Sequence, residues 1–354
     1  MHLLTNPNDI ETLYESFRES KQSFIAMDTE FIRQKTFYPE LCLIQIAFDN
    51  TCAIVDTLSP TWHPKTLKPF IFEDFLTLVF HSCRQDLEVL FHLYKELPSY
   101  IFDTQIAAVF LGLSTHLGSS LSYHDLVKHY LGLSIDKSQQ HTDWMRRPLA
   151  FEQVKYAAED VVYLADIYPM ILSDLDHHGR LKWALDEMRS LSSPDSITSS
   201  TPSRLSRMGI YKKNYAWAKA LFAFQHKHAS RLNMNRSRFL SDKAITAMSL
   251  CQSKEKLIDF AKRATSLEAY NLLEELCDVF DHTKDQKDDD PLAMPLTTSQ
   301  QKTLSELRKH SEKCAKELNL PPSFLANAED LRLYVLQKKG RLLTTWRKEA
   351  LGLL

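Results

Sequence analysis

Residues 23–30 read Ser-Phe-Ile-Ala-Met-Asp-Thr-Glu, an apolar strand that ends in two closely spaced acids. Side chains two positions apart in a strand share a face, so Asp28 and Glu30 point the same way. Two carboxylates this close repel each other, and burial makes their charges still more costly. A divalent cation would offset that cost, although a strand that simply ends in a polar turn explains the same pattern.

The residues around this strand predict a mixed sheet covered by helices. Leu41–Phe48 is almost entirely apolar, which is typical of a strand buried on both faces. Thr51–Val55 follows after a short turn and completes a hairpin, and Leu78–His81 is a fourth strand candidate. Helical patterns cover 85–96, 103–111, 121–131 and 151–176.

Composition excludes several classes of protein. The chain has 354 residues, 44% hydrophobic and 25% charged, which favours two or three globular domains over a disordered chain. Its seven glycines form neither a G-x-G fingerprint nor a P-loop, so an NTPase motor or a dinucleotide-dependent dehydrogenase is not expected.

The cysteines and the apolar stretches indicate a cytoplasmic protein. Six scattered cysteines form no CxxC pair, so a zinc knuckle is not expected. The N-terminus lacks an apolar secretion segment, and the longest apolar stretch is too short to span a bilayer. We therefore expect a reduced, cytoplasmic protein without a membrane partner.

Charge is distributed unevenly along the chain. Residues 1–190 contain 16 Lys and Arg against 26 Asp and Glu, whereas the remainder contains 27 against 19. Ser, Thr and Pro are frequent in 191–208, and 281–297 is polar with two prolines, so both stretches are predicted linkers. An acidic N-terminal part suggests cation sites, and a basic remainder suggests a polyanionic partner.

Two further motifs carry acids. Asp86 is predicted in the first turn of a helix, where the helix dipole alone would explain it. Tyr156 and Asp160 are four apart on a predicted helix and therefore share a face. Asp160 stands among alanines and valines, where an acid without a partner or a metal would be costly.

Taken together, the order Asp-x-Glu, Asp, Tyr-x3-Asp resembles the DEDD 3′→5′ exonucleases of the tyrosine subgroup. The sequence around these motifs resembles the ribonuclease D family over residues 23–168. It is carried by Asp28-Thr-Glu-Phe-Ile-Arg, Thr36-Phe-Tyr-Pro-Glu-Leu-Cys-Leu-Ile-Gln-Ile, Asp86-Leu-Glu-Val-Leu and Asp136-Lys-Ser-Gln-Gln-His-Thr-Asp-Trp. Position 155 is Lys155, so the histidine of the other DEDD subgroup is absent.

This resemblance implies a ribonuclease H-like α/β fold and a catalytic set of Asp28, Glu30, Asp86, Tyr156 and Asp160. It also implies two divalent ions, Mg²⁺ or Mn²⁺. Asp28, Glu30 and Asp160 would hold one ion, and Asp28 with Asp86 the other. Tyr156 would attend the attacking water, as a base or only by positioning it.

The remainder of the chain shows only helical periodicity, which predicts two small all-α domains. Residues 196–241 contain no acid and nine basic residues, a pattern that suits a phosphate backbone. Trp217, Leu221 and Phe224 fall at helical spacing and are expected in the core. The candidate contacts to nucleic acid are Lys137, Lys212, Lys213, Arg231, Arg236 and Arg238.

Residues 209–280 also resemble an HRDC domain, a helical nucleic-acid-binding module. That likeness is carried by Tyr215-Ala-Trp, Ala223-Phe-Gln-His-Lys-His-Ala and Asn233-Met-Asn-Arg-Ser-Arg-Phe-Leu-Ser-Asp-Lys-Ala. Residues 298–354 would be a second, divergent copy, after an exonuclease domain over 1–190.

The resemblance implies an exoribonuclease that trims free 3′ ends of structured RNA, tRNA precursors included. We expect the protein to be a monomer. A DNA 3′→5′ exonuclease and an inactive RNA-binding protein are the alternatives. The intact acidic set argues against the inactive protein, because a binding module has no use for clustered acids beside a polyanion.

Overall fold

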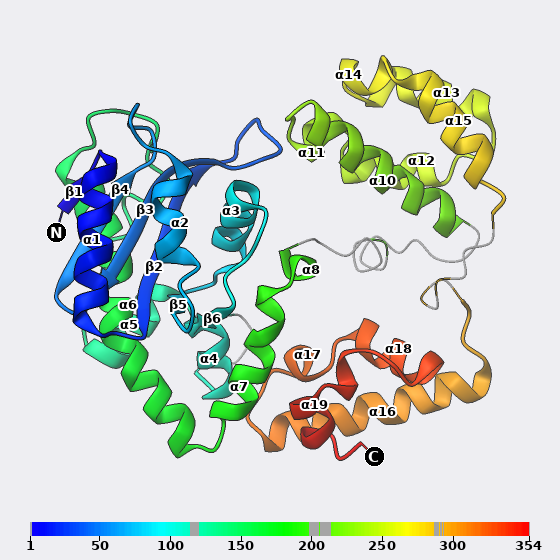
Figure 1. Cartoon of the computed structure of the whole chain (residues 1–354). Coiled ribbons are helices and arrows are strands. Elements are labelled where there is room, and N and C mark those ends of the chain that lie inside the picture. The colour runs from blue at the N-terminus through cyan, green and yellow to red at the C-terminus, as the bar shows by residue number, and fades with distance from the viewer. Residues whose placement is uncertain are drawn as a thin grey trace.

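The structure is a computed structural model that describes residues 2–113, 120–197, 205, 214–286, 290, 292 and 294–353. Figure 1 shows three groups of elements: a sheet with its helices, a bundle of α10 to α15, and a second bundle of α16 to α19. None of the described helices combines the length and the apolar character needed to cross a membrane.

The six-stranded sheet has the order β1-β4-β3-β2-β5-β6. Its strands are β1 (His2–Leu4), β2 (Phe24–Ile32), β3 (Glu40–Phe48), β4 (Thr51–Asp56), β5 (Thr77–Phe80) and β6 (Tyr100–Asp103). β3 is antiparallel to both of its neighbours, whereas β1–β4, β2–β5 and β5–β6 are parallel pairs. The mixed sheet and its four predicted strands are confirmed. β1 and β6 were not predicted, because strands this short show no clear periodicity.

Helices cover both faces of the sheet, as predicted. The elements of one face are α1 (Pro7–Ser20), α2 (Pro64–Ile71) and α3 (Arg84–Tyr94); those of the other are α4 (Thr104–Phe110), α5 (Tyr123–Leu131) and α6 (Phe151–His177). Along β3, Leu43 and Ala47 belong to the core under α6, and Ile44 and Ile46 to the core on the opposite side. β3 is therefore buried on both faces, and each face has its own hydrophobic core.

The first helical bundle has a core of its own. Its helices are α10 (Tyr215–Arg231), α11 (Arg236–Phe239), α12 (Asp242–Ser249), α13 (Lys254–Ala264), α14 (Leu267–Tyr270) and α15 (Leu273–Thr283). Trp217, Leu221 and Phe224 are buried in this core, as expected, and the Trp217 indole donates a hydrogen bond to Met248 O. Phe37, from the loop between β2 and β3, belongs to the same core.

The second bundle continues the core of the sheet part. It comprises α16 (Thr298–Glu317), α17 (Pro322–Leu325), α18 (Ala328–Gln337), a 3-10 turn η4 (Arg341–Leu343) and α19 (Thr345–Ala350). Trp346 packs against Phe110 of α4, and both belong to the core under α6. α7 (Leu181–Met188) contributes Glu187, whose carboxylate accepts hydrogen bonds from buried Arg347.

The predicted linkers are described only in part. The first begins inside a 3-10 turn η1 (Arg189–Ser192) and continues through a helical turn α8 (Pro194–Ile197); of residues 198–208 only Leu205 is described. The second begins inside α15, and residues 287–289, 291 and 293 lie outside the described residues. The domain limits 1–190, 209–280 and 298–354 therefore stay predictions.

Candidate active site

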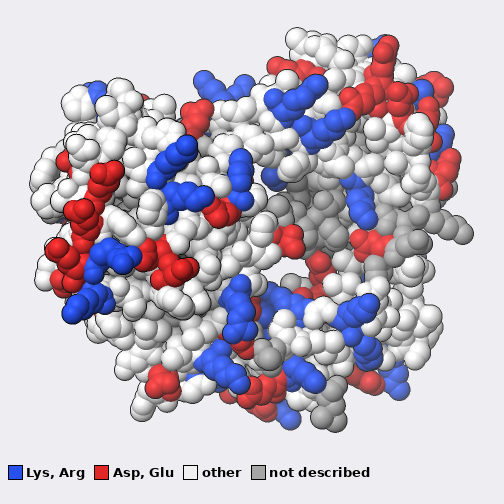
Figure 2. All heavy atoms as spheres, viewed as in Figure 1, with Lys and Arg blue, Asp and Glu red and all other residues white. Residues whose placement is uncertain are grey.

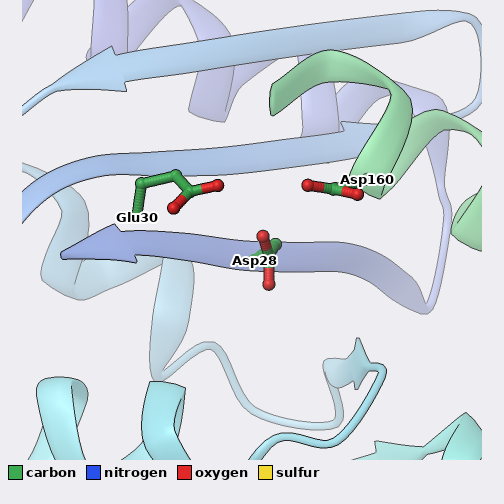
Figure 3. A group of neighbouring side chains, drawn as sticks. All are labelled: Asp28, Glu30 and Asp160. Carbon is green, nitrogen blue, oxygen red and sulfur yellow. The ribbon is translucent and has the colours of Figure 1, made fainter. Parts of the chain in front are cut away.

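β2 and α6 bring three acids together. Asp28 and Glu30 lie on the face of β2 that α6 covers, and Asp160 comes down from α6 (Figure 3). One carboxylate oxygen of each lies within 4.8 Å of the others. Ala157 and Ala158 are buried on α6, and such small side chains let a helix approach the sheet closely enough for an aspartate to reach a strand.

Asp86 reaches the same place from the first turn of α3. β5 pairs with β2 only along Phe24–Ala26. Farther along β2, at Asp28 and Glu30, the strand edge on the β5 side therefore has no strand neighbour among the described residues, whereas the opposite edge pairs with β3. The turn after β5 places the start of α3 there. Asp86 is buried, and its carboxylate accepts a hydrogen bond from the Thr29 hydroxyl.

All five predicted catalytic residues line one cavity of about 490 Å³. The acids and Tyr156 come from three segments that are far apart in the sequence. The other lining residues include His81, Ser82, Gln85, Gln105, Tyr123, Gln140 and His141. The structure thus brings the whole predicted set together.

Burial raises the pKa values of all four carboxyls, and the charges of neighbouring acids raise them further. Burial is the main cause for each, and it raises the pKa of Glu30 to about 9, of Asp160 to about 8 and of Asp86 to about 7. The pKa of Asp28 is raised well above its ordinary value by burial and by the charges of Asp86, Asp160 and Glu30. Such a cluster holds its negative charge at neutral pH only when cations compensate it.

The donor set of this cavity fits hard divalent cations. Mg²⁺ and Mn²⁺ prefer oxygen ligands, and these four side chains offer only carboxylate oxygens. Asp28, Glu30 and Asp160 form the compact group, and Asp86 lies beside it. The residues present therefore fit the metal dependence that the resemblance implies.

Tyr156 lies one helical turn before Asp160, and its nearby hydroxyl favours the charged form of that acid and so lowers its pKa. Burial, followed by the charges of Asp160 and Glu30, raises the pKa of the Tyr156 hydroxyl far above its ordinary value. The hydroxyl is therefore protonated at neutral pH and can donate a hydrogen bond. Trp144, whose ring lies 6.1 Å from that of Tyr156, is buried.

Three supporting residues were not predicted from the sequence. Thr29 holds Asp86, as described above. The buried Asp103 carboxylate accepts hydrogen bonds from the backbone N–H groups of Ser82 (3.0 Å) and Cys83 (2.9 Å) at the start of α3, and it also caps α4. Gln45 is fully buried and pairs with Asp28 across β2 and β3. Only the capping role of Asp103 had a sequence signal, namely an acid directly before a helical pattern.

The candidate nucleic-acid contacts fall into three groups. Lys137 is exposed in the loop whose residues Gln140 and His141 line the cavity. Arg231 and Arg238 are exposed on the first bundle, while half-buried Arg236 packs 4.7 Å from the centre of the Phe37 ring. Lys212 and Lys213 lie outside the described residues. In Figure 2, basic side chains lie over α10 and α11, and acidic ones gather over α13 and α15.

The chain is similar to proteins described as nucleases. A family model described as 3′-5′ exonuclease matches residues 1–176. The chain is 30% identical to ribonuclease D of Gluconacetobacter diazotrophicus, across 99% of this chain and 90% of that relative. It is 37% identical to ribonuclease D of Zymomonas mobilis, across 66% of this chain and 60% of that relative. The crystal structure of Escherichia coli RNase D superposes with a TM-score of 0.80 at 23% identity, covering 99% of this chain and 96% of that chain, which shows the shared fold.

Proposed function

The chain belongs to the ribonuclease D family and is a hydrolytic, metal-dependent 3′→5′ exoribonuclease; we propose that it works with two divalent cations held by Asp28, Glu30, Asp86 and Asp160. The observation that carries this proposal is the single cavity in which four carboxylates from β2, α3 and α6 meet Tyr156. Acids so crowded and so buried are suited to binding cations and poorly suited to a purely structural role.

Each side chain has a distinct task in this proposal. Asp28, Glu30 and Asp160 hold one ion, and Asp28 together with Asp86 holds the other. Two such ions stabilise the attacking and the leaving oxygens of an in-line phosphoryl displacement. Tyr156 donates a hydrogen bond that orients the attacking water, and its raised pKa makes it a positioning group rather than a base.

The proposed substrate is structured RNA with a free 3′ end, tRNA precursors included. The acid-free basic run over 196–241 supports a polyanionic ligand, because phosphate contacts from Lys and Arg dominate such binding. We assign residues 209–280 and 298–354 as HRDC-like modules that follow the exonuclease domain, with Lys137, Lys212, Lys213, Arg231, Arg236 and Arg238 as candidate contacts. The protein is proposed to act as a cytoplasmic monomer.

The decisive experiment compares matched RNA and DNA oligonucleotides with free and blocked 3′ ends, in Mg²⁺ and in Mn²⁺. We expect stepwise release of 5′-nucleoside monophosphates from a free RNA 3′ end, and none from a blocked end. Cleavage of the blocked strand would contradict the exonuclease assignment, and faster degradation of DNA would favour the DNA exonuclease.

Variants test the site itself. Asp28→Ala, Asp86→Ala and Asp160→Asn should abolish hydrolysis while circular dichroism remains that of the wild type. Asp166→Asn, which changes an exposed acid on α6, the helix that carries Asp160, is the matched control and should keep full activity. Normal turnover by Asp28→Ala would count against the proposed metal site.

A further inference from the structure

Gln45 is a buried residue whose side-chain amide has no hydrogen-bond partner among the described residues. It lies in the middle of β3 with no exposed surface, and neither its Nε2 nor its Oε1 has a hydrogen-bond partner among the described residues. A buried amide normally forms hydrogen bonds, because leaving it unpaired forfeits its bonds to water without replacement. An apolar residue in its place would avoid this cost, so its presence needs an explanation.

The sheet register points to that explanation. Gln45 stands directly opposite Asp28 in the antiparallel pair of β3 and β2. Residues that face each other in this way share one side of the sheet, with their Cβ atoms about 5 Å apart. That side lies under α6, where the carboxylates of Asp28, Glu30 and Asp160 gather. The unpaired amide is therefore the cross-strand neighbour of the acid that belongs to both proposed ion sites.

We propose that Gln45 is a positioning residue of the metal centre, whose amide Nε2–H donates to the Asp28 carboxylate when divalent cations are bound. This proposal rests on the proposed function, because it assumes that Asp28 is a metal ligand. A hydrogen bond from the amide would fix the orientation of a carboxylate that must serve two ions, as partners of metal ligands commonly do. Without cations, Gln45 would only add an unsatisfied polar group to the core.

The proposal predicts opposite effects of one substitution in two conditions. Gln45→Met keeps the length of the side chain and removes its polar atoms. In EDTA we expect an unfolding temperature equal to that of the wild type or higher. In a Mn²⁺ titration followed by thermal unfolding, we expect the midpoint concentration to rise about tenfold or more, the usual effect of losing such a partner. Gln45→Leu provides a second variant should the methionine disturb packing.

Gln225 is a matched control for this experiment. It too is a fully buried glutamine, but it lies in the first bundle, and its amide donates to Leu240 O and Arg236 O. Gln225→Met should therefore lower the unfolding temperature in EDTA and leave the Mn²⁺ midpoint unchanged.

The possible outcomes separate the two proposals. A Mn²⁺ midpoint in both Gln45 variants within about twofold of the wild type would overturn the role of Gln45 and leave the metal site standing. An unfolding temperature in EDTA that falls as it does for Gln225→Met would also overturn it, because Gln45 would then be an ordinary structural residue. A wild type that Mn²⁺ does not stabilise would overturn both the metal centre and the role of Gln45.

Discussion

Thr29 lies between Asp28 and Glu30 in the sequence, but its side chain contacts a third candidate metal ligand, Asp86. Its hydroxyl donates to the buried Asp86 carboxylate, which stabilises the charged form of that acid and lowers its pKa. Burial works in the opposite direction and is stronger, so the pKa of Asp86 still lies at about 7. The Thr29 hydroxyl is the largest of the contributions that favour the charged form of this acid, ahead of the backbone hydrogen bonds of Asp86 and Thr29.

Replacing Thr29 by Val should shift the pH dependence of activity. Asp86 must be ionised to bind a cation, and loss of the donor raises its pKa. A hydrogen bond to a charged group contributes about 1.5 kcal/mol, which corresponds to about one pKa unit. We expect the acidic limb of the kcat/KM profile to move upward by about that amount. Thr29→Ser keeps the hydroxyl and should keep the profile, whereas a profile that stays in place for Thr29→Val would contradict this coupling.

Asp160 should destabilise the metal-free protein at high pH. Its pKa is about 8 in the folded chain, above the ordinary value of 3.8. Because the folded protein holds this proton more tightly than the unfolded chain does, the stability of the fold is highest below the unfolded-state pKa. It is lost as the pH rises through the folded-state pKa. Asp160→Asn removes this loss. In EDTA the variant should therefore unfold several degrees above the wild type at pH 9, and at the same temperature near pH 4.

Thermal unfolding scans at these two pH values check the prediction. Asp166→Asn alters an exposed acid on α6 and should leave the unfolding temperature unchanged at both. A stabilisation of Asp160→Asn that does not grow with pH would show that charge burial is not its cause.

At the scale of elements, the start of α3 depends on Asp103, the last residue of β6. Ser82 has a φ of +65°, a left-handed conformation that is costly for residues other than glycine. The Asp103 carboxylate accepts hydrogen bonds from the backbone N–H groups of Ser82 and Cys83. It also accepts one from the backbone N–H of Gln105 (2.8 Å) at the start of α4. One buried acid thus holds the starts of two helices, and α3 carries Asp86 in its first turn.

A double substitution tests this support. Asp103→Asn loses one of the two acceptor oxygens, so the turn at Ser82 should relax and kcat should fall. Adding Ser82→Gly should recover part of the loss, because glycine adopts positive φ values at little cost. The measurement is kcat on 3′-labelled RNA together with the unfolding temperature. A double variant no better than Asp103→Asn would contradict the role of this turn.

At the scale of the whole molecule, the loop after the catalytic strand β2 joins the sheet part to the first bundle. Asn233 Oδ1 accepts hydrogen bonds from the N–H groups of Phe37 (3.2 Å) and Tyr38 (3.1 Å), and Phe37 is buried in the bundle core. On the other side, the Tyr38 ring stacks on His92 of α3 at 4.1 Å. The loop therefore contacts both the bundle and the helix that carries Asp86.

Weakening this contact between the loop and the first bundle should slow the degradation of long RNA and leave the chemical step unchanged. Asn233→Ala removes the acceptor for both N–H groups and puts alanine at a φ of +45°, which strains the turn. We expect about tenfold slower degradation of structured RNA, because the bundle is held less firmly near the site, and unchanged hydrolysis of a dinucleotide.

Asn233→Asp keeps an acceptor oxygen and is the matched control, expected to behave like the wild type on both substrates. Small-angle scattering should show a larger radius of gyration for Asn233→Ala alone. An equal loss of activity on the dinucleotide would mean that this contact acts on the catalytic strand itself.

The second bundle is bound to the sheet part by a continuous core. Burial raises the pKa of Glu187, but the hydrogen bonds and charge of Arg347, a hydrogen bond from Trp346 and the charge of Arg341 together outweigh it and hold that pKa below its ordinary value. The Arg347 side chain is 1% exposed, so the pair ties α19 to α7 within a largely buried interface. The sequence predicted the helices of this bundle but not this contact, because helical periodicity shows which face is apolar and not what covers it.

The chemistry of the site was largely predictable because it follows from local patterns. The period of two in β2 places Asp28 and Glu30 on one face, and the spacing of four in α6 aligns Tyr156 with Asp160. Thr29, Asp103 and Gln45 were not predictable as supporting residues, since their roles depend on neighbours distant in sequence. Arg236 was predicted as a nucleic-acid contact, and only the structure shows that it packs over Phe37.

By itself, the sequence determined which acids exist, which side of its own strand or helix each one faces, and which family the chain resembles. The tertiary structure decided that these acids share one cavity. Strand pairing and helix packing are long-range, and here β5 pairs with only the first residues of β2. That short pairing leaves an open strand edge on which α3 can place Asp86 against Thr29, a juxtaposition that no local pattern encodes.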